Sequence, residues 1–330
     1  MTEPIPSIVR GARQAPVPVG PLTGRRTALR RAGAHALAAV NRLLDRLPVG
    51  RTLHRRIQHA LATSELPFAC ARGGAGLDGL RIAFLTDLHA GSFMDASDLC
   101  RVMERVAAAE PHLVLFGGDL INTREREILL YRDALRLLRP ELGVFAVPGN
   151  HDHFWGHDIG LWTAFLREHG VQVLLNRGVR IERRGASLWL CGVDDLTEGA
   201  PDLRAALDGR SADEPALLLS HHPDFFFEAA AAGVDLTLSG HTHGGQIRIG
   251  GWAPIHHSRF GYERGWFAEG GSRLYVSRGI GVTVLPLRIG APPEIPVVVF
   301  AVQQANAAAR SDAAAANARG GATAAAAAKA

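Results

Sequence analysis

The chain has 330 residues, enough for one large or two small domains, and 47% of them are apolar, which excludes a wholly disordered protein. Three widely spaced cysteines without a CxxC pair exclude a disulfide framework and a zinc ribbon. Residues 1–60 carry eleven Arg against Glu3 and Asp45, about +9, which leaves about −5 for the remainder of a chain whose net charge is +4.

The first predicted segment is a basic N-terminal arm, residues 1–64. Residues 1–24 are rich in Pro and Gly, whereas apolar residues at helical spacing among arginines predict an amphipathic helix over residues 27–47. We find no run of the roughly 20 apolar residues that a transmembrane helix needs. Such an arm favours binding to an anionic membrane surface, with a solvated leader and nucleic-acid binding as the alternatives.

The arm also raises the question of export. Arg25 and Arg26 precede an alanine-rich patch, as in twin-arginine leaders, but this patch (residues 32–40) is short and contains His35. We therefore expect a protein that is cytoplasmic or peripheral on the cytoplasmic membrane, with export through a twin-arginine-like leader as the alternative.

Residues 65–302 alternate apolar runs with helical patterns, which predicts a layered α/β domain with functional groups at the carboxyl ends of its strands. The later half has more strand-like runs, which suggests a second sheet packed on the first. An alanine-rich tail without bulky anchors, residues 303–330, is expected to be disordered or frayed. The predicted strands are 81–86, 113–116, 144–147, 179–183, 188–193, 216–219, 236–239, 274–276 and 295–300, and the predicted helices are 97–109 and 124–138.

Polar side chains that bind metals recur in or beside these strands and at glycine turns. They supply two acids, one amide and several imidazoles, a mixture that suits two adjacent divalent or trivalent transition metals. No single stretch is specific, but the ordered set is hard to obtain by chance. The five stretches are Asp87-x-His89, Gly118-Asp119, Gly149-Asn150-His151-Asp152, His221 and Gly240-His241-x-His243.

The spacing of the donors suggests how they are shared. In an extended segment alternate side chains point the same way, so Asp87 and His89 are expected to reach one metal. The same alternation predicts that His241 and His243 face one way. Asp119 follows two glycines at a strand end and is the only acid placed to bridge two cations.

Two further donors complete the predicted set. Asn150 offers a neutral oxygen after a tight turn, which avoids excess negative charge. His221 directly follows a predicted strand, and its neighbour His222 is the alternative for the same position.

The ordered motifs DLH, GGDLI, GNHD, SHH and GHTH resemble those of the calcineurin-like metallophosphoesterases. The stretches at residues 78–91, 240–246, 275–279 and 292–295 look like their bacterial phosphodiesterase branch, and the resemblance covers roughly residues 65–301. It implies a bacterial protein with a four-layer αββα sandwich of two mixed β-sheets flanked by helices, and a dinuclear site between the sheet edges.

The resemblance also implies roles for individual residues. His151 would neutralise the transition state or protonate the leaving oxygen, and Asp152 would orient it. Arg278 is a candidate contact to a phosphate oxygen, as is Arg288, with a surface salt bridge as the alternative for both. One metal would be bound by Asp87, His89 and His243, the other by Asn150, His221 and His241, with Asp119 bridging; manganese, iron or zinc would serve.

The function implied is a dinuclear metal-dependent phosphoester hydrolase, foremost a phosphodiesterase, that uses a metal-bridging hydroxide for in-line attack at phosphorus. The basic arm favours a phosphodiester or pyrophosphate substrate presented at a membrane, including lipid-linked substrates, and no nucleic-acid partner is expected. An enzyme like UDP-diacylglucosamine pyrophosphatase is the alternative within lipid metabolism. A nuclease and a non-catalytic scaffold of the same fold are the remaining alternatives.

Overall fold

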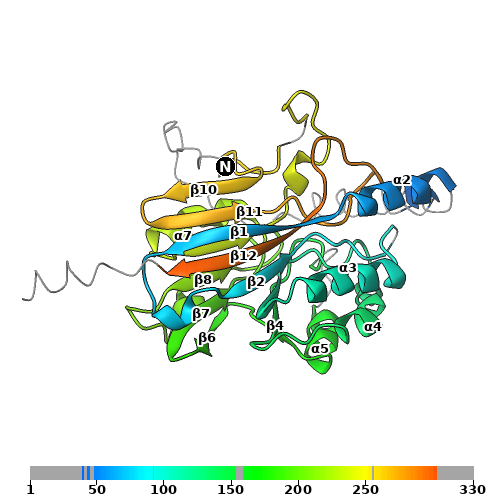
Figure 1. The fold of residues 1–330 in the computed structure, drawn as a ribbon. Coiled ribbons are helices and arrows are strands. Elements are labelled where there is room, and N and C mark those ends of the chain that lie inside the picture. Colours follow the sequence, from blue (N-terminus) through cyan, green and yellow to red (C-terminus); the bar gives the residue numbers. More distant parts are fainter. Residues whose placement is uncertain are drawn as a thin grey trace, which may run out of the picture.

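The computed structural model describes residues 39–40, 43–44, 48–91, 93–153, 159–254 and 256–302. Two six-stranded β-sheets lie face to face, and helices cover their outer faces (Figure 1). Of the helix predicted over residues 27–47, only the four described residues 39–40 and 43–44 are seen, and they are helical. The alanine-rich tail lies outside the described residues.

The first sheet has the strand order β1-β12-β2-β3-β4-β5. Strands β2 to β5 are parallel, β12 is antiparallel to β2, and β1 runs parallel to β12 along the edge. The strands are β1 (Ala62–Cys70), β2 (Arg81–Leu85), β3 (Leu113–Phe116), β4 (Val144–Ala146), β5 (Val171–Val173) and β12 (Glu294–Val302).

The second sheet has the strand order β10-β11-β9-β8-β7-β6. Its four central strands are parallel, and the two edge strands β6 and β10 are antiparallel to their neighbours. The strands are β6 (Arg177–Arg183), β7 (Ala186–Gly192), β8 (Ala216–Leu219), β9 (Leu236–Ser239), β10 (Gly265–Glu269) and β11 (Ser272–Val276).

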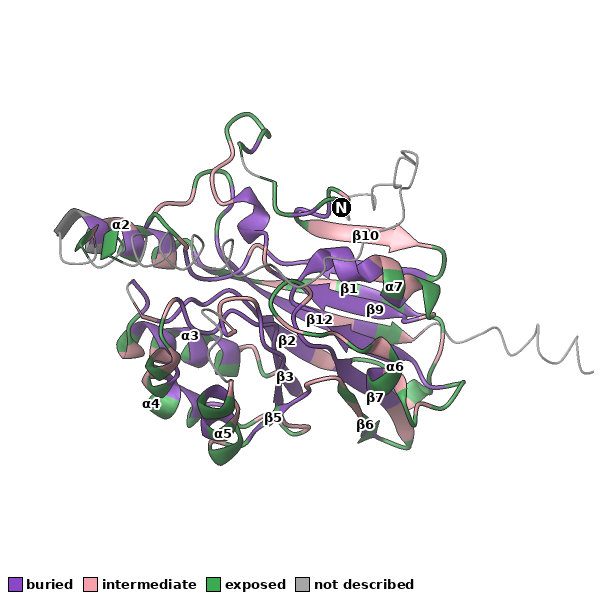
Figure 2. Cartoon of the chain, turned by 180° about the vertical axis from the view of Figure 1, so that it is seen from behind, coloured by how far each residue is buried: buried purple, intermediate pink, exposed green. Residues whose placement is uncertain are grey.

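Three apolar layers separate the sheets and helices. Alternate side chains of β2 point to opposite faces, so Phe84 enters the layer between the sheets while Leu85 packs toward the helices. On the first sheet lie α3 (Ala96–Ala108), α4 (Arg132–Leu135) and α5 (Gly160–Glu168), and on the second lie α6 (Leu203–Leu207) and α7 (Phe226–Ala231). The predicted four-layer αββα sandwich is confirmed, with its strands buried at the centre (Figure 2).

All the predicted strands are present, with ends within two residues of the predicted ones. The sequence did not reveal β1, β5 and β10, which are edge strands. Each is short or carries polar residues on its exposed side, so its apolar pattern is weak. Pro67 in β1 also fits an edge, where a missing N–H is tolerated.

The helix predicted over residues 124–138 is wrong in length. The segment instead forms a 3-10 helix, η2 (Glu125–Tyr131), followed by the single turn of α4. Glu127 folds back and accepts hydrogen bonds from the backbone N–H groups of Asn122, Thr123 and Arg124, which ties the start of this segment to the loop before it.

Helix α2 (Pro48–His59) lies on the rim of the sandwich. Ile57 packs on Phe93 and Val282, and the Gln58 amide donates to the carbonyl oxygen of Ile280 at 3.4 Å. None of the helices in the described part of the chain has both the length and the apolar composition to cross a membrane. The division of the chain at residues 64 and 302 stays a prediction.

Candidate metal centre

The predicted donors come together at one edge of both sheets, because the strands that precede them are parallel within each sheet. The backbone N–H of Asp87 donates to the carbonyl oxygen of Gly118 at 3.0 Å, and that of His89 donates to Asp119 at 3.0 Å, so the first two loops are tied together. Asp87 follows β2, Asp119 follows β3, Asn150 follows β4, His221 follows β8 and His241 follows β9.

Five of the donor residues have a left-handed backbone, with φ of 54° at Asp87, 49° at His89, 54° at Asp119, 70° at His241 and 51° at His243. Residues other than glycine rarely adopt this conformation, and each instance costs about 1–3 kcal/mol. The extended segments assumed for Asp87–His89 and His241–His243 are therefore wrong, and tight turns bring the side chains inward instead.

Glycines make these turns possible. Gly118 has a φ of +94°, and a Cβ atom there would lie 2.7 Å from the backbone nitrogen of Gly149. A Cβ atom at Gly149 would lie 2.3 Å from Oδ1 of Asp119. The two loops approach so closely that neither position accepts a side chain.

The first half-site is formed by Asp87, His89 and His243. The Nε2 atoms of His89 and His243 lie 3.0 Å apart, and Nε2 of His243 lies 3.5 Å from Oδ1 of Asp87. All three side chains are buried. Three donor atoms therefore converge on one small volume.

The second half-site lies on the other side of Asp119. Oδ2 of Asp119 is 3.2 Å from Nε2 of His221 and 3.6 Å from Nε2 of His89, so one carboxylate oxygen faces both half-sites. Nδ1 of His241 is 2.8 Å from Oδ1 of Asn150. His241 thus lies beside Asn150 and His243 beside Asp87, contrary to the expectation that they face one way.

The structure places His221 rather than His222 beside Asp119. Nδ1 of His221 donates to the carbonyl oxygen of Gly117 at 2.8 Å, which leaves Nε2 to face the carboxylate. His222 instead accepts a hydrogen bond from the backbone N–H of Asp224, and its ring lies against that of His241 with centroids 4.2 Å apart.

His151 and Asp152 lie next to the donors. Nδ1 of His151 donates to the carbonyl oxygen of Asn122 at 2.7 Å, and its ring stands edge-on to that of His89 with centroids 4.5 Å apart. Asp152 accepts hydrogen bonds from the backbone N–H groups of Leu120, Ile121 and Gly149, so its carboxylate holds the two donor loops together.

The two arginines have different surroundings. Nη2 of Arg278 is 2.6 Å from Oε2 of Glu294, and its Nε donates to the carbonyl oxygen of Pro292, so its guanidinium is already paired. Nη2 of Arg288 lies 3.1 Å from Nδ1 of His243. Sequence reasoning did not foresee that contact, because Arg288 reaches the histidine only through a loop that folds back.

Burial sets the protonation states. It lowers the pKa values of His89, His241 and His243 well below the usual range, which keeps these imidazoles neutral. Burial works in the opposite direction on Asp119, but attraction to His221 and His151 outweighs it and holds the pKa of Asp119 well below its usual value. Burial raises the pKa of Asp87 to about 6, and, although burial alone would lower it, attraction to Asp119 raises the pKa of His221 to about 10. Neutral imidazoles and ionised carboxylates are the forms that ligate metals, and a nearby cation favours both.

The donor spacing also fits metal ions. Bonds of about 2.1 Å to one ion place neighbouring ligand atoms roughly 3.0–3.5 Å apart. The separations between donor atoms in the cluster extend from 2.8 Å for Asn150 and His241 to 4.0 Å for Asp87 and His89, a spread centred on that range. Two buried carboxylates, Asp87 and Asp119, also call for compensating positive charge. The residues present therefore fit two metal ions.

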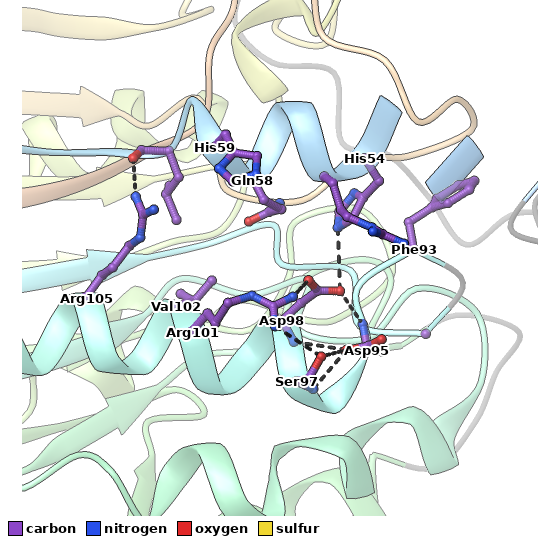
Figure 3. A pocket seen from close by; sticks show the side chains of 13 residues that line it. His54, Gln58, His59, Phe93, Asp95, Ser97, Asp98, Arg101, Val102 and Arg105 are labelled. Atoms are coloured by element: carbon purple, nitrogen blue, oxygen red, sulfur yellow. Dashed lines mark hydrogen bonds and ion pairs between the residues drawn. The ribbon is translucent and has the colours of Figure 1, made fainter. Parts of the chain in front are cut away.

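A separate cavity of about 470 Å³ opens between α2 and α3, away from the predicted ligands (Figure 3). Three arginines, Arg55, Arg101 and Arg105, line it together with Asp95 and Asp98. It borders Phe93, which belongs to the apolar contact between α2 and Val282.

Residues 80–245 match the family model described as calcineurin-like phosphoesterase, which is half of the chain. The chain is 32% identical to the metallophosphoesterase YkuE of Bacillus subtilis over 253 residues. The matched region covers 75% of this chain and 87% of YkuE.

Two other relatives are longer. A metallophosphoesterase of Helicobacter pylori strain J99 is 34% identical over 66% of this chain and 58% of its own length. A bovine transmembrane protein with metallophosphoesterase domain is 32% identical over 73% of this chain and 57% of its own. This chain thus spans little more than half the length of these two relatives.

Proposed function

The chain belongs to the calcineurin-like phosphoesterase family, and from that premise we propose that it is a dinuclear metal-dependent phosphodiesterase. The observation that carries the proposal is the position of Asp119, whose Oδ2 lies within 3.6 Å of a histidine of each half-site. A carboxylate shared between two sets of donors can hold a pair of adjacent metal ions.

The two half-sites provide the ligands of the proposed metal pair. When bound, two such ions supply water of lowered pKa as the nucleophile and neutralise the charge that develops at phosphorus. Manganese, iron and zinc all accept this set of oxygen and nitrogen donors. The ligands would be Asp87, His89 and His243 for one ion and Asn150, His221 and His241 for the other, with Asp119 shared.

We assign to His151 the protonation of the leaving oxygen. Its Nδ1 donates to the carbonyl oxygen of Asn122 and its ring stands edge-on to that of His89, so the imidazole is held beside the half-sites, and we assign the proton transfer to its Nε2. The side chain is only half-buried, which leaves it open to a substrate. Asp152 acts as a positioning residue, because it holds the backbone of both loops on which Asp119 and His151 lie.

The proposed substrates are phosphodiesters or pyrophosphates, including lipid-linked ones, met at an anionic membrane surface that the N-terminal arm binds. The sequence of α2, PVGRTLHRRIQH, supports this, since it is basic and contains no acid. A nucleotide-lipid pyrophosphatase like UDP-diacylglucosamine pyrophosphatase is the second candidate on the same ground. Arg278 is not among the proposed substrate contacts, because Glu294 already pairs with it.

The proposed function is tested with purified metal-loaded protein and a panel of soluble esters. We expect faster hydrolysis of bis-p-nitrophenyl phosphate than of p-nitrophenyl phosphate, and loss of both activities on chelation. A clear preference for the monoester would show that the family chemistry is present but the phosphodiesterase assignment is wrong.

A further inference from the structure

Large apolar side chains are exposed on two loops next to the metal centre, residues 246–254 and 282–290. Ile249 is 69% exposed and Trp252 is 65% exposed. Single exposed apolar residues are ordinary, but several on neighbouring loops mark a surface that is covered in use. The exposed side chains of this surface are Ile249, Trp252, Val284, Leu285 and Ile289.

The two loops form one structural unit, which we call the apolar rim. The backbone N–H of Arg248 donates to the carbonyl oxygen of Ile289 at 2.7 Å, and the Gln246 amide donates to that of Thr283 at 2.9 Å. Figure 1 shows both loops on the side of the molecule from which α2 projects. The exposed side chains therefore lie on a single support.

The apolar rim adjoins the metal centre. Gln246 follows His243 by three residues, and Arg288 within the second loop reaches Nδ1 of that histidine at 3.1 Å. The guanidinium of Arg288 also donates to the carbonyl oxygen of Gly281 from Nε, at 2.8 Å. Whatever covers the rim is thereby brought close to the candidate catalytic groups.

The charge around the rim is positive. Helix α2 contacts the second loop through Ile57 and Val282. The cavity beneath this helix is mixed in charge, because Asp95 and Asp98 line it with its arginines (Figure 3), so the positive charge lies on the helix and the loops. Helix α2 and the two loops contain no Asp or Glu, in contrast to the acidic remainder of the chain. Their described arginines are Arg55, Arg56, Arg248 and Arg288, of which Arg55 and Arg56 are exposed.

We propose that the apolar rim docks the catalytic domain on an anionic lipid bilayer, with Ile249 and Trp252 entering the interface. Exposed Trp and aliphatic residues bordered by arginines are the composition of interfacial membrane contacts. A symmetric dimer through the rim would bring the arginines of two copies together without any acid to pair them. The purpose of docking rests on the proposed function, because a docked domain would present lipid phosphates to the metal centre.

The test uses the tryptophans of the full-length, metal-loaded protein. The chain has Trp155, Trp162, Trp189, Trp252 and Trp266 and none in residues 1–64, so a tryptophan signal reports the catalytic domain and not the arm. The probe is a vesicle of phosphatidylglycerol and phosphatidylethanolamine with brominated acyl chains, which quench nearby indoles. We expect quenching in the wild type, and loss of most of it in Trp252→Phe, which keeps an apolar side chain but removes this indole.

A second pair of variants separates docking from misfolding. Ile249→Ser combined with Trp252→Ser should weaken partition into these vesicles about tenfold or more, because two apolar side chains no longer enter the interface. The matched control is Leu161→Ser, an exposed apolar residue on α5, and it should bind vesicles as the wild type does. Circular dichroism checks that both variants are folded.

Bound wild-type protein without quenching would show that the arm alone holds the membrane and would overturn the proposal. A wild-type dimer that the double serine variant converts to a monomer would overturn it in favour of a second copy. Turnover of bis-p-nitrophenyl phosphate is measured separately, without vesicles. If the wild type binds vesicles but does not turn over this diester, the proposed function is refuted and the docking surface is not.

Discussion

The imidazoles of His89 and His243 face each other with their Nε2 atoms 3.0 Å apart, although 154 residues separate them in the chain. Both residues are buried and have a left-handed backbone. Burial lowers both pKa values, so the rings are neutral and at most one proton can lie between the two nitrogens. This opposition of two neutral rings is best explained by a cation that both would bind.

Removal of one of these ligands should empty one half-site. We expect His243→Ala to bind about one metal ion per chain where the wild type binds two, and to lose roughly a hundredfold or more in diester turnover. Elemental analysis and steady-state kinetics measure the two effects. His256→Ala, a change at an exposed histidine, is the control and should keep both metals. Two metals in His243→Ala would remove this histidine from the ligand set.

Arg288 should support the metal centre through the loop that contacts Asp87. Its Nε donates to the carbonyl oxygen of Gly281 at 2.8 Å, and the backbone N–H of Gly281 donates to the carbonyl oxygen of Asp87 at 2.7 Å. Because Arg288→Met removes this support, it should weaken metal affinity about 10–100-fold, the usual cost of losing an outer contact to a ligand. Competition with a fluorescent chelator measures the affinity. Arg136→Met, at an exposed arginine that pairs with Asp133 on α4, should leave the affinity unchanged. Equal affinities in all three proteins would contradict the assigned role.

Chelation should destabilise the fold, because bound metal ions compensate the buried carboxylates Asp87 and Asp119. Occupancy at a hundred times the dissociation constant contributes about 2.7 kcal/mol to the free energy of unfolding. In a chain of this size we expect Tm to fall by several degrees when metal is removed. Differential scanning calorimetry with and without chelator measures this shift, and an unchanged Tm would argue against two well-occupied sites.

A pair across the two sheets should make stability depend on pH. Nε2 of His153, after β4, lies 2.6 Å from Oδ1 of Asp194, after β7. Burial alone would lower the pKa of His153, but hydrogen bonding to Asp194 outweighs burial and raises it. Burial alone would raise the pKa of Asp194, but the same hydrogen bond helps to lower it. The histidine contribution is complete below its unfolded pKa and is lost as pH rises through the folded one, whereas the aspartate contribution is lost at acidic pH.

His153→Gln should therefore lower the free energy of unfolding more at about pH 5.5 than at about pH 8.5, where the wild-type histidine is neutral. Urea denaturation at the two pH values measures the difference. The control is His256→Gln, at an exposed histidine that faces Glu263, and it shows what the loss of any histidine does to stability. A larger loss at the higher pH would show that the pair is not ionised.

The central strands and the donors could be read from the sequence for one physical reason. Strands such as β2 and β3 are buried on both faces, so their apolar runs are continuous, and the polar residues directly after them stand out. Edge strands lack that contrast, and β5 was missed because Gln172 lies exposed between two buried valines.

The parts of the site that were missed depend on distant contacts. The left-handed backbone at Asp87 and His243 follows from the close approach of separate loops, which no local pattern reports. Arg288 was recognised as a candidate phosphate contact, yet its partner is a histidine 45 residues earlier. The apolar rim was missed because its exposed residues lie in two separate segments, and Val284 follows Trp252 by 32 positions.

The proposed metal centre depends most directly on Asp119 as the acid shared by two metal ions. Electron paramagnetic resonance of the manganese-loaded protein tests this, because two ions joined by a shared ligand give an exchange-coupled signal. We predict two manganese ions per chain with a coupled signal in the wild type and in the exposed-acid control Asp133→Asn, and loss of coupling and of diester turnover in Asp119→Asn. An isolated single-ion signal in fully active wild-type protein would contradict the account.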